Sequence, residues 1–230
     1  MSIIIREMKV EDLHAIVDIA KLAFPYDKQF VYKYPYREEY PEEHHKNLTI
    51  RYTEYLNSTF AGRNTIMIAE APDLTEPNVA KVVAFSIWSN VGTSPPGQDT
   101  AAIAPSEQHY ERKDCNTERL KAYRAATTKA RKDIFARMYG ERQSSLRQLA
   151  TLPEYWHRGV GTQLLHWGME RSREQGVPIT LFAGPMGKNL YEKHGFKELE
   201  KVHVQVDGES AAIFQTAMSW NPKLDTDDAQ

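Results

Sequence analysis

Apolar and polar positions in the first quarter of the chain predict one strand and two helices. The apolar run at residues 3–6 predicts a strand, and over 10–24 the apolar residues recur at roughly helical spacing. Pro25 ends this helix. An aromatic-rich stretch over 30–40 follows, and residues 43–59 predict a second helix.

Six further strands are predicted from short apolar runs bounded by turn residues. They cover residues 65–70, 79–88, 144–152, 179–182, 196–206 and 211–220. The first two form a hairpin with a long polar connection, and the last two are joined by Asp207-Gly208, a hairpin turn signal. One helix follows the strand at 144–152, and a shorter helix precedes the strand at 196–206.

The link between the third and fourth strands, residues 89–142, is unusually long. It opens with a loop rich in glycine and proline, and residues 107–138 predict a helix from their content of Lys, Arg, Glu and Ala. Its apolar members are too sparse for a core helix: they are Tyr110, Leu120, Tyr123, Ile134, Phe135 and Met138. Two interpretations stay open, a wall or lid over a substrate site and a solvated helical excursion.

Composition narrows the class of protein without naming an activity. The 230 residues carry a formal charge of −2, so the net charge does not indicate binding to nucleic acid or to an anionic membrane. No apolar stretch is long enough to span a bilayer, and residues 1–6 do not resemble a signal peptide. A single cysteine, Cys115, excludes an intrachain disulfide, and we expect a cytoplasmic protein. The histidines lack paired metal-ligand spacing, so no metal site is predicted.

The segment from Leu149 to Leu165 predicts an anion site. A strand is followed by Pro153, a short basic turn, Gly159 and Gly161, and then an amphipathic helix. The first N–H groups of a helix have no partner within it, and the helix dipole adds partial positive charge there. The glycines allow a phosphate oxygen to approach the backbone closely.

The details of this segment separate it from other phosphate-binding motifs. No Lys-Ser or Lys-Thr pair follows either glycine, which excludes a P-loop, and Leu164 stands where a dinucleotide fingerprint needs glycine. The sequence Trp156-His157-Arg158-Gly159-Val160-Gly161 resembles the pyrophosphate-binding signature Gln/Arg-x-x-Gly-x-Gly/Ala of the GNAT superfamily of acyl-CoA-dependent N-acyltransferases. Trp156 departs from that signature, which has Gln or Arg at this position. The departure removes one polar side-chain contact and leaves the backbone donors of the phosphate-binding turn (the cradle) intact.

A second box supports the same resemblance. Lys188 to Phe196 reads Lys-Asn-Leu-Tyr-Glu-Lys-His-Gly-Phe and is similar to the family's "YEKLGF" box. In the family, the tyrosine of this box donates a proton to the departing thiolate. The resemblance therefore implies that Tyr191 is the general acid.

The resemblance also implies the fold, the co-substrate and its site. We expect an α/β (α+β) GNAT fold, with a central mixed, mostly antiparallel sheet flanked by helices, as a single domain over 1–220 with a disordered tail over 221–230. It implies acetyl-CoA as co-substrate and no metal. The coenzyme-binding residues would be Leu149, Ala150, Thr151, Trp156, His157, Arg158, Gly159, Val160, Gly161 and Thr162.

The sequence leaves the general base and the acceptor open. The strand at 144–152 has no carboxylate, so Glu70, Asp27 and an ordered water chain all stay candidates. Four early tyrosines either line the acceptor pocket or pack the fold: they are Tyr32, Tyr34, Tyr36 and Tyr40. A small-molecule amine is the expected acceptor. The alternatives are a protein lysine or N-terminal amine, and an acyl-CoA-binding protein without catalysis. A homodimer through Trp88 or the last strands is a further possibility.

Overall fold

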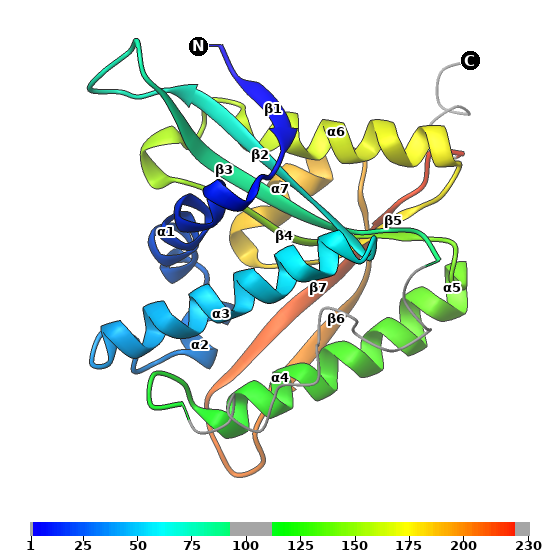
Figure 1. The fold of residues 1–230 in the computed structure, drawn as a ribbon. Coiled ribbons are helices and arrows are strands. Elements are labelled where there is room, and N and C mark those ends of the chain that lie inside the picture. The colour runs from blue at the N-terminus through cyan, green and yellow to red at the C-terminus, as the bar shows by residue number, and fades with distance from the viewer. Residues whose placement is uncertain (1, 93–111, 224–230) are drawn as a thin grey trace.

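A seven-stranded sheet forms the centre of the molecule in the order β1-β2-β3-β4-β5-β7-β6 (Figure 1). The computed structural model describes residues 2–92 and 112–223. The strands are β1 (Ile4–Glu7), β2 (Asn64–Pro72), β3 (Ala80–Ser89), β4 (Ser144–Thr151), β5 (Ile179–Ala183), β6 (Lys197–Gln205) and β7 (Ala212–Trp220). Among these strands only β4 and β5 pair in parallel. The predicted mixed, mostly antiparallel sheet is confirmed.

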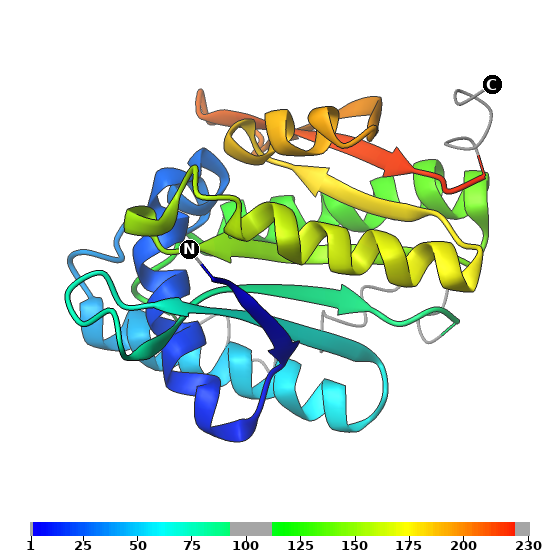
Figure 2. The same ribbon diagram turned by 90° about the horizontal axis from the view of Figure 1, so that it is seen from above.

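Helices cover both faces of this sheet (Figures 1 and 2). They are α1 (Leu13–Ala23), α2 (Lys28–Lys33), α3 (Pro41–Phe60), α4 (Thr117–Ala130), α5 (Arg137–Tyr139), α6 (Val160–Gln175) and α7 (Pro185–Lys193). A π-helical turn, Arg131–Ala136, joins α4 to α5, and 3₁₀ turns span Val10–Asp12, Phe24–Tyr26 and Pro153–Tyr155. None of the helices in the described ranges is both long and apolar enough to cross a membrane.

The largest apolar core holds α1, α3 and α6 against strands β2 to β5. The closest packing is between α6 and β3, at Gly168 and Trp88. A Cβ at Gly168 would lie 2.1 Å from the Trp88 ring, so only glycine lets the helix approach this closely. Trp88 is 2% exposed and packs inside the fold, and the homodimer stays a prediction.

The two parallel strands separate soon after they meet. Their pairing covers three positions, from Ser144 with Ile179 to Leu146 with Leu181. Beyond them β4 stays paired with β3 only, and Arg147 is an extra residue in that ladder, a β-bulge that bends the strand. In Figure 2, β4 and β5 diverge toward their arrowheads. Among the described residues, one edge of β4 from Gln148 onward therefore has no strand paired with it.

The insertion between β3 and β4 is a packed layer rather than a solvated excursion. Its helix begins at Thr117, capped by the Asn116 side chain, and not at residue 107 as predicted. Ile134 and Phe135 are buried against β6 and β7. The few apolar residues are enough to pack this helix, because only one of its sides is buried and the other faces solvent. The predicted helical residues 107–111 and the loop 93–106 lie outside the described residues, as do tail residues 224–230.

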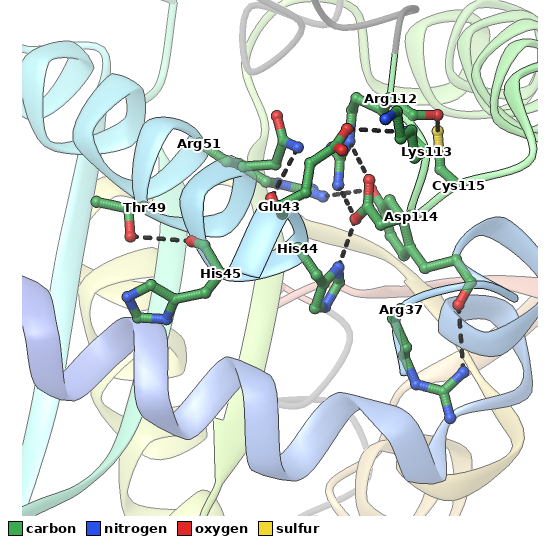
Figure 3. A network of polar contacts seen from close by, with 12 residues as sticks. Arg37, Glu43, His44, His45, Thr49, Arg51, Arg112, Lys113, Asp114 and Cys115 are labelled. Atoms are coloured by element: carbon green, nitrogen blue, oxygen red, sulfur yellow. Dashed lines mark hydrogen bonds and ion pairs between the residues drawn. The ribbon is translucent and has the colours of Figure 1, made fainter. Parts of the chain in front are cut away.

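A buried ionic network ties the start of this insertion to α3 (Figure 3). Asp114 is fully buried, accepts a hydrogen bond from the Arg112 guanidinium at 2.8 Å, and lies 2.6 Å from His44 Nδ1. Burial opposes ionisation of Asp114, but the hydrogen bonds from His44 and Arg112 outweigh it and hold its pKa below the usual value. The network therefore fixes residues 112–114 to the helix that covers β2.

The aromatic stretch after α1 contains a short helix that the sequence does not predict. Residues 28–33 form the short helix α2, which the Asp27 side chain caps by accepting from the Gln29 N–H at 2.8 Å. Proline-punctuated aromatic sequences give no helical period over so few residues, so this helix has no sequence signal. It lies between α3 and the insertion (Figure 1).

Candidate active site

The N-terminus of α6 presents a row of free backbone donors. Gly159 caps the helix in the left-handed conformation, with φ 79°, and the first bond of the helix runs from Gln163 N–H to its carbonyl. Among the described residues, no acceptor bonds the N–H groups of Val160, Gly161 and Thr162. Three donors and the positive end of the helix dipole thus converge on one place, the arrangement that binds a phosphate.

The loop before α6 is held in a strained shape. His157 has φ 58°, which is uncommon for a residue with a side chain. The Trp156 indole N–H donates to the Thr151 carbonyl at 2.7 Å, and its ring packs edge-on against Tyr26 at 4.9 Å. Trp156 therefore holds the loop to the end of β4 instead of offering a polar group to a ligand. The exposed Arg158 side chain bonds back to the Glu154 carbonyl at 3.2 Å.

Behind the cradle lies the gap beside β4. A Cβ at Gly161 would have Thr151 Oγ1 at 3.6 Å, Leu190 Cδ2 at 3.8 Å and Leu149 Cδ2 at 4.0 Å. The first turn of α6, the end of β4 and helix α7 thus meet there. Ala150 points away, into the core, and only its backbone could contact a ligand. The structure brings the ten predicted coenzyme residues into one continuous segment around this gap.

Tyr191 lies on α7 with a free hydroxyl group. Its ring packs on Phe196 at 5.6 Å and against Gly187, and 8% of the residue is exposed. Within the described part of the chain its hydroxyl makes no hydrogen bond. Burial raises the pKa of this phenol above its usual value, and the negative charge of Asp27 adds to the effect. The group therefore stays protonated at neutral pH and can act as a donor.

Asp27 lies against the same helix, and Glu70 does not. A Cβ at Gly184, the residue before α7, would lie 2.7 Å from Asp27 Oδ2, so the carboxylate touches the start of the Tyr191 helix. Burial raises the pKa of Asp27. Glu70 instead forms an ion pair with Arg6 at 2.6 Å on β1 and β2, at the other edge of the sheet. Of the two carboxylates, only Asp27 is positioned to reach Tyr191's surroundings.

The sequence analysis missed two cations beside Asp27. Lys33, on the last turn of α2, has its Nζ 3.9 Å from the centroid of the Tyr123 ring on α4. Arg51, on α3, contacts the Tyr34 hydroxyl at 3.4 Å. The four-residue spacing of Arg51 and Tyr55 on a helix was the available signal, but it is common on solvated faces.

The early tyrosines divide between packing and surface. Tyr34 is 2% exposed and packs on His44, Tyr32 is buried with the Arg119 guanidinium 5.0 Å from its ring, and Tyr36 is 45% exposed. Tyr40 immediately precedes α3. Of these four tyrosines, Tyr34 is therefore the one that lies next to Lys33 and Arg51. No cluster of three or more metal-ligating side chains occurs among the described residues.

Comparisons with known proteins point to one family. A family model described as "Acetyltransferase (GNAT) domain" matches residues 125–198, which include α6 and Tyr191. A curated protein named "Acetyltransferase" from Stachybotrys chartarum is 23% identical over 212 residues, covering 92% of this chain and 87% of that protein.

Solved structures share the fold at low identity. A mosquito arylalkylamine N-acetyltransferase like 5b has a TM-score of 0.60 with 15% identity, covering 96% of this chain and 100% of the other. A PaiA N-acetyltransferase from Thermoplasma acidophilum, solved in complex with coenzyme A, has a TM-score of 0.54 with 16% identity, covering 96% and 99%.

Proposed function

We propose that the chain is an acyltransferase of the GNAT family, which its similarity to the GNAT family model and to the curated acetyltransferase supports, and that it transfers the acetyl group of acetyl-CoA directly to the amine of a small molecule. The observation that carries the proposal is the separation of β4 and β5, with three free N–H groups at one end and helix α7, which carries Tyr191, beside them. The neighbour solved with coenzyme A supports the choice of donor.

The residues around the gap fit the coenzyme. The N–H groups of Val160, Gly161 and Thr162 would take the pyrophosphate, and Gly161 keeps a side chain away from these donors. The unpaired edge of β4, from Gln148 to Thr151, would take the amide-rich arm as another strand would. The same N–H groups on β4 are suited to stabilise the oxyanion that develops on the thioester carbonyl.

The transfer needs one base and one acid. The amine nitrogen forms a bond to the thioester carbon, and the carbon–sulfur bond breaks. Asp27 takes the proton that the amine loses, since most amines are protonated at neutral pH and must be activated. Tyr191 donates to the departing sulfur, so that no free thiolate is left in the low-dielectric gap.

A small-molecule acceptor is supported by what surrounds the gap. Lys33 of α2, Arg51 of α3 and Tyr123 of the insertion helix α4 lie close together near Asp27. An acceptor with its amine at Asp27 would therefore have to be short. A protein lysine or N-terminal amine as acceptor, and a non-catalytic coenzyme-binding role, are the alternatives that the experiment separates.

The first experiment is calorimetric titration of the protein with acetyl-CoA and with free coenzyme A, followed by a screen of amines and peptides for thiol release. Micromolar binding and turnover with small amines would support the proposal. Turnover with peptides alone would assign a protein acceptor, and binding without turnover would assign a non-catalytic role. Failure to bind either coenzyme would overturn the proposal.

Tyr191→Phe is expected to lower kcat about 100-fold, because a positioned acid typically contributes that much, and to leave the Kd for coenzyme A nearly unchanged. Steady-state kinetics and titration measure the two quantities. Tyr139→Phe is the matched control, since its hydroxyl bonds Ser219 at the far end of the insertion. Equal kcat values for Tyr191→Phe and wild type would remove Tyr191 from the acid role.

Asp27→Asn is expected to lower kcat/KM about 100-fold near neutral pH and to remove one acidic limb from its pH profile. Asparagine caps a helix as well as aspartate does, so α2 should be preserved. In the wild type, kcat/KM falls as pH drops through the raised pKa of Asp27, because the protonated carboxyl cannot accept a proton. The exposed Asp18→Asn serves as control, and an unaltered profile in the Asp27 variant would leave the base role to water.

A further inference from the structure

Two cations from different helices converge on one tyrosine beside the proposed transfer site. Lys33 Nζ, from α2, lies 5.8 Å from the centroid of the Tyr34 ring. The Arg51 guanidinium, from α3, reaches the hydroxyl of the same ring at 3.4 Å. Figure 3 shows Arg51 pointing from α3 toward the network around Asp114. The two positive charges are thus neighbours, and each lies on an element that carries other groups of the site.

No carboxylate pairs with either cation among the residues the structure describes. Their contacts are aromatic: Lys33 lies over Tyr123 at 3.9 Å, and Arg51 lies 5.8 Å from the Tyr55 ring. Arg6 and Arg112, by contrast, each form an ion pair with a carboxylate. Charges removed from water are normally paired, because desolvation is costly. Asp27 acts on Lys33 from a distance without forming an ion pair, so two neighbouring cations share one unpaired carboxylate and have charge left for a further anion.

The electrostatics of Lys33 agree with this geometry. Burial and the positive charge of Arg51 lower the pKa of Lys33 to about 7. A negative charge bound between the two side chains would oppose both effects and raise the pKa of Lys33. The pair is therefore poised to gain charge when an anion arrives.

The cations face the place where the acetyl group would be transferred. Lys33 follows Asp27 on the same short helix by six residues, about 9 Å along its axis. Tyr52, next to Arg51, donates to Gln148 on β4 at 2.7 Å, at the point where β5 turns away. A molecule with its amine at Asp27 could therefore present its other end to Lys33 and Arg51.

A buried amide on the floor of this region supports a polar occupant. Gln215, on β7, is fully buried; its amide nitrogen and carbonyl oxygen make no hydrogen bond of good geometry in the described ranges, although its side chain interacts with the Tyr123 phenol. The Tyr123 phenol that stacks on Lys33 lies beside it, and burial raises the pKa of that phenol to about 12. A buried polar group without a partner is costly unless a ligand satisfies it.

We propose that the acceptor amine carries an anionic group at its other end, a carboxylate or a phosphate, and that Lys33 and Arg51 bind this group. The inference rests on the proposed acetyl transfer and narrows its substrate class to zwitterionic amines. Uncharged arylalkylamines, the class in the name of the mosquito neighbour, would then be poor acceptors.

Matched pairs of acceptors test this directly. Phenylalanine with phenethylamine and β-alanine with ethylamine differ by a carboxylate, and phosphoethanolamine with ethanolamine differs by a phosphate. We expect the anionic member of at least one pair to have a 10- to 100-fold higher kcat/KM, mainly through KM, as charge-assisted hydrogen bonds provide. The pair that responds identifies the anion.

Variants then assign the preference to the two cations. Lys33→Met and Arg51→Met keep a long side chain without charge, and each should lower the preference at least 10-fold while turnover of the uncharged member persists. Lys28→Met and Lys46→Met, exposed on the same two helices, are the controls. Arg51→Lys, which keeps the charge, should retain part of the preference, and circular dichroism checks that every variant folds.

The outcomes separate the two proposals. Turnover with equal or higher kcat/KM for the uncharged member of every pair overturns the inference and leaves acetyl transfer intact. If no amine is acetylated, titration of the protein with the three anionic compounds still decides, because binding lost in Arg51→Met supports the anion site and no binding overturns it. Failure to bind coenzyme bears only on the proposed acetyl transfer.

Discussion

Gly161→Asp is expected to abolish binding of acetyl-CoA and coenzyme A. The new side chain would enter the space bordered by Thr151, Leu190 and Leu149, all within 4.0 Å of its Cβ. Its carboxylate would stand beside the N–H groups that receive the pyrophosphate. Repulsion between two charges about 4 Å apart amounts to about 4 kcal/mol at an effective dielectric constant of about 20, or roughly 1,000-fold in Kd. Calorimetric titration measures the loss.

Gly161→Ala is the matched control for bulk. Its Cβ would make only ordinary contacts, the nearest at 3.6 Å, so this variant should fold and bind coenzyme with little change. Thermal melts of all three proteins exclude unfolding as the cause of lost affinity. Wild-type affinity in a folded Gly161→Asp protein would remove the α6 N-terminus from the coenzyme site.

Asp114→Asn is expected to lower the free energy of unfolding by about 3–5 kcal/mol, because removing one partner of a buried ionic network leaves the others uncompensated. Asp114 is completely buried between Arg112 and His44, and asparagine keeps its shape but not its charge. Denaturant unfolding followed by circular dichroism measures the change. Asp133→Asn, in an exposed pair with Lys129, should change stability far less, because water and salt screen exposed ion pairs.

The same variant predicts a pH dependence with a definite sign. The pKa of Asp114 is lower in the folded chain than its ordinary value near 3.9, so its charge stabilises the fold above that pH. This stabilisation disappears as pH falls through the lowered folded pKa. The stability difference between wild type and Asp114→Asn should therefore narrow in acid. A difference that stays constant down to the lowest pH at which both proteins fold would contradict the network's role.

Local patterns in the sequence were enough to predict most of the sheet and the coenzyme side. Short apolar runs predict the strands, and Gly159 and Gly161 at the start of an amphipathic helix predict the phosphate-binding turn. Both signals depend only on residues that are close together in the chain. The mixed, mostly antiparallel character of the sheet and the choice of Tyr191 as general acid came from the resemblance to a family. The roles of the individual site residues stay predictions.

The acceptor side could not be predicted in the same way, because its contacts join residues far apart. Asp114 meets His44 across 70 positions, and Lys33 meets Tyr123 across the insertion. Neither pairing produces a period or a motif. Likewise, Glu70 and Asp27 were equivalent as candidate bases in the sequence, and only the ion pair with Arg6 separates them.

The short seam between β4 and β5 has a mechanical consequence. Three residue pairs connect the two halves of the sheet, and the Thr180 hydroxyl adds contacts with Ser145 Oγ at 2.7 Å and with Gln143 Oε1 at 2.9 Å. A bound coenzyme that fills the gap would act as a further rung between those halves. Coenzyme affinity would then be coupled to the stability of the β4–β5 pairing. A substitution that weakens this pairing would lower coenzyme affinity without contacting the coenzyme.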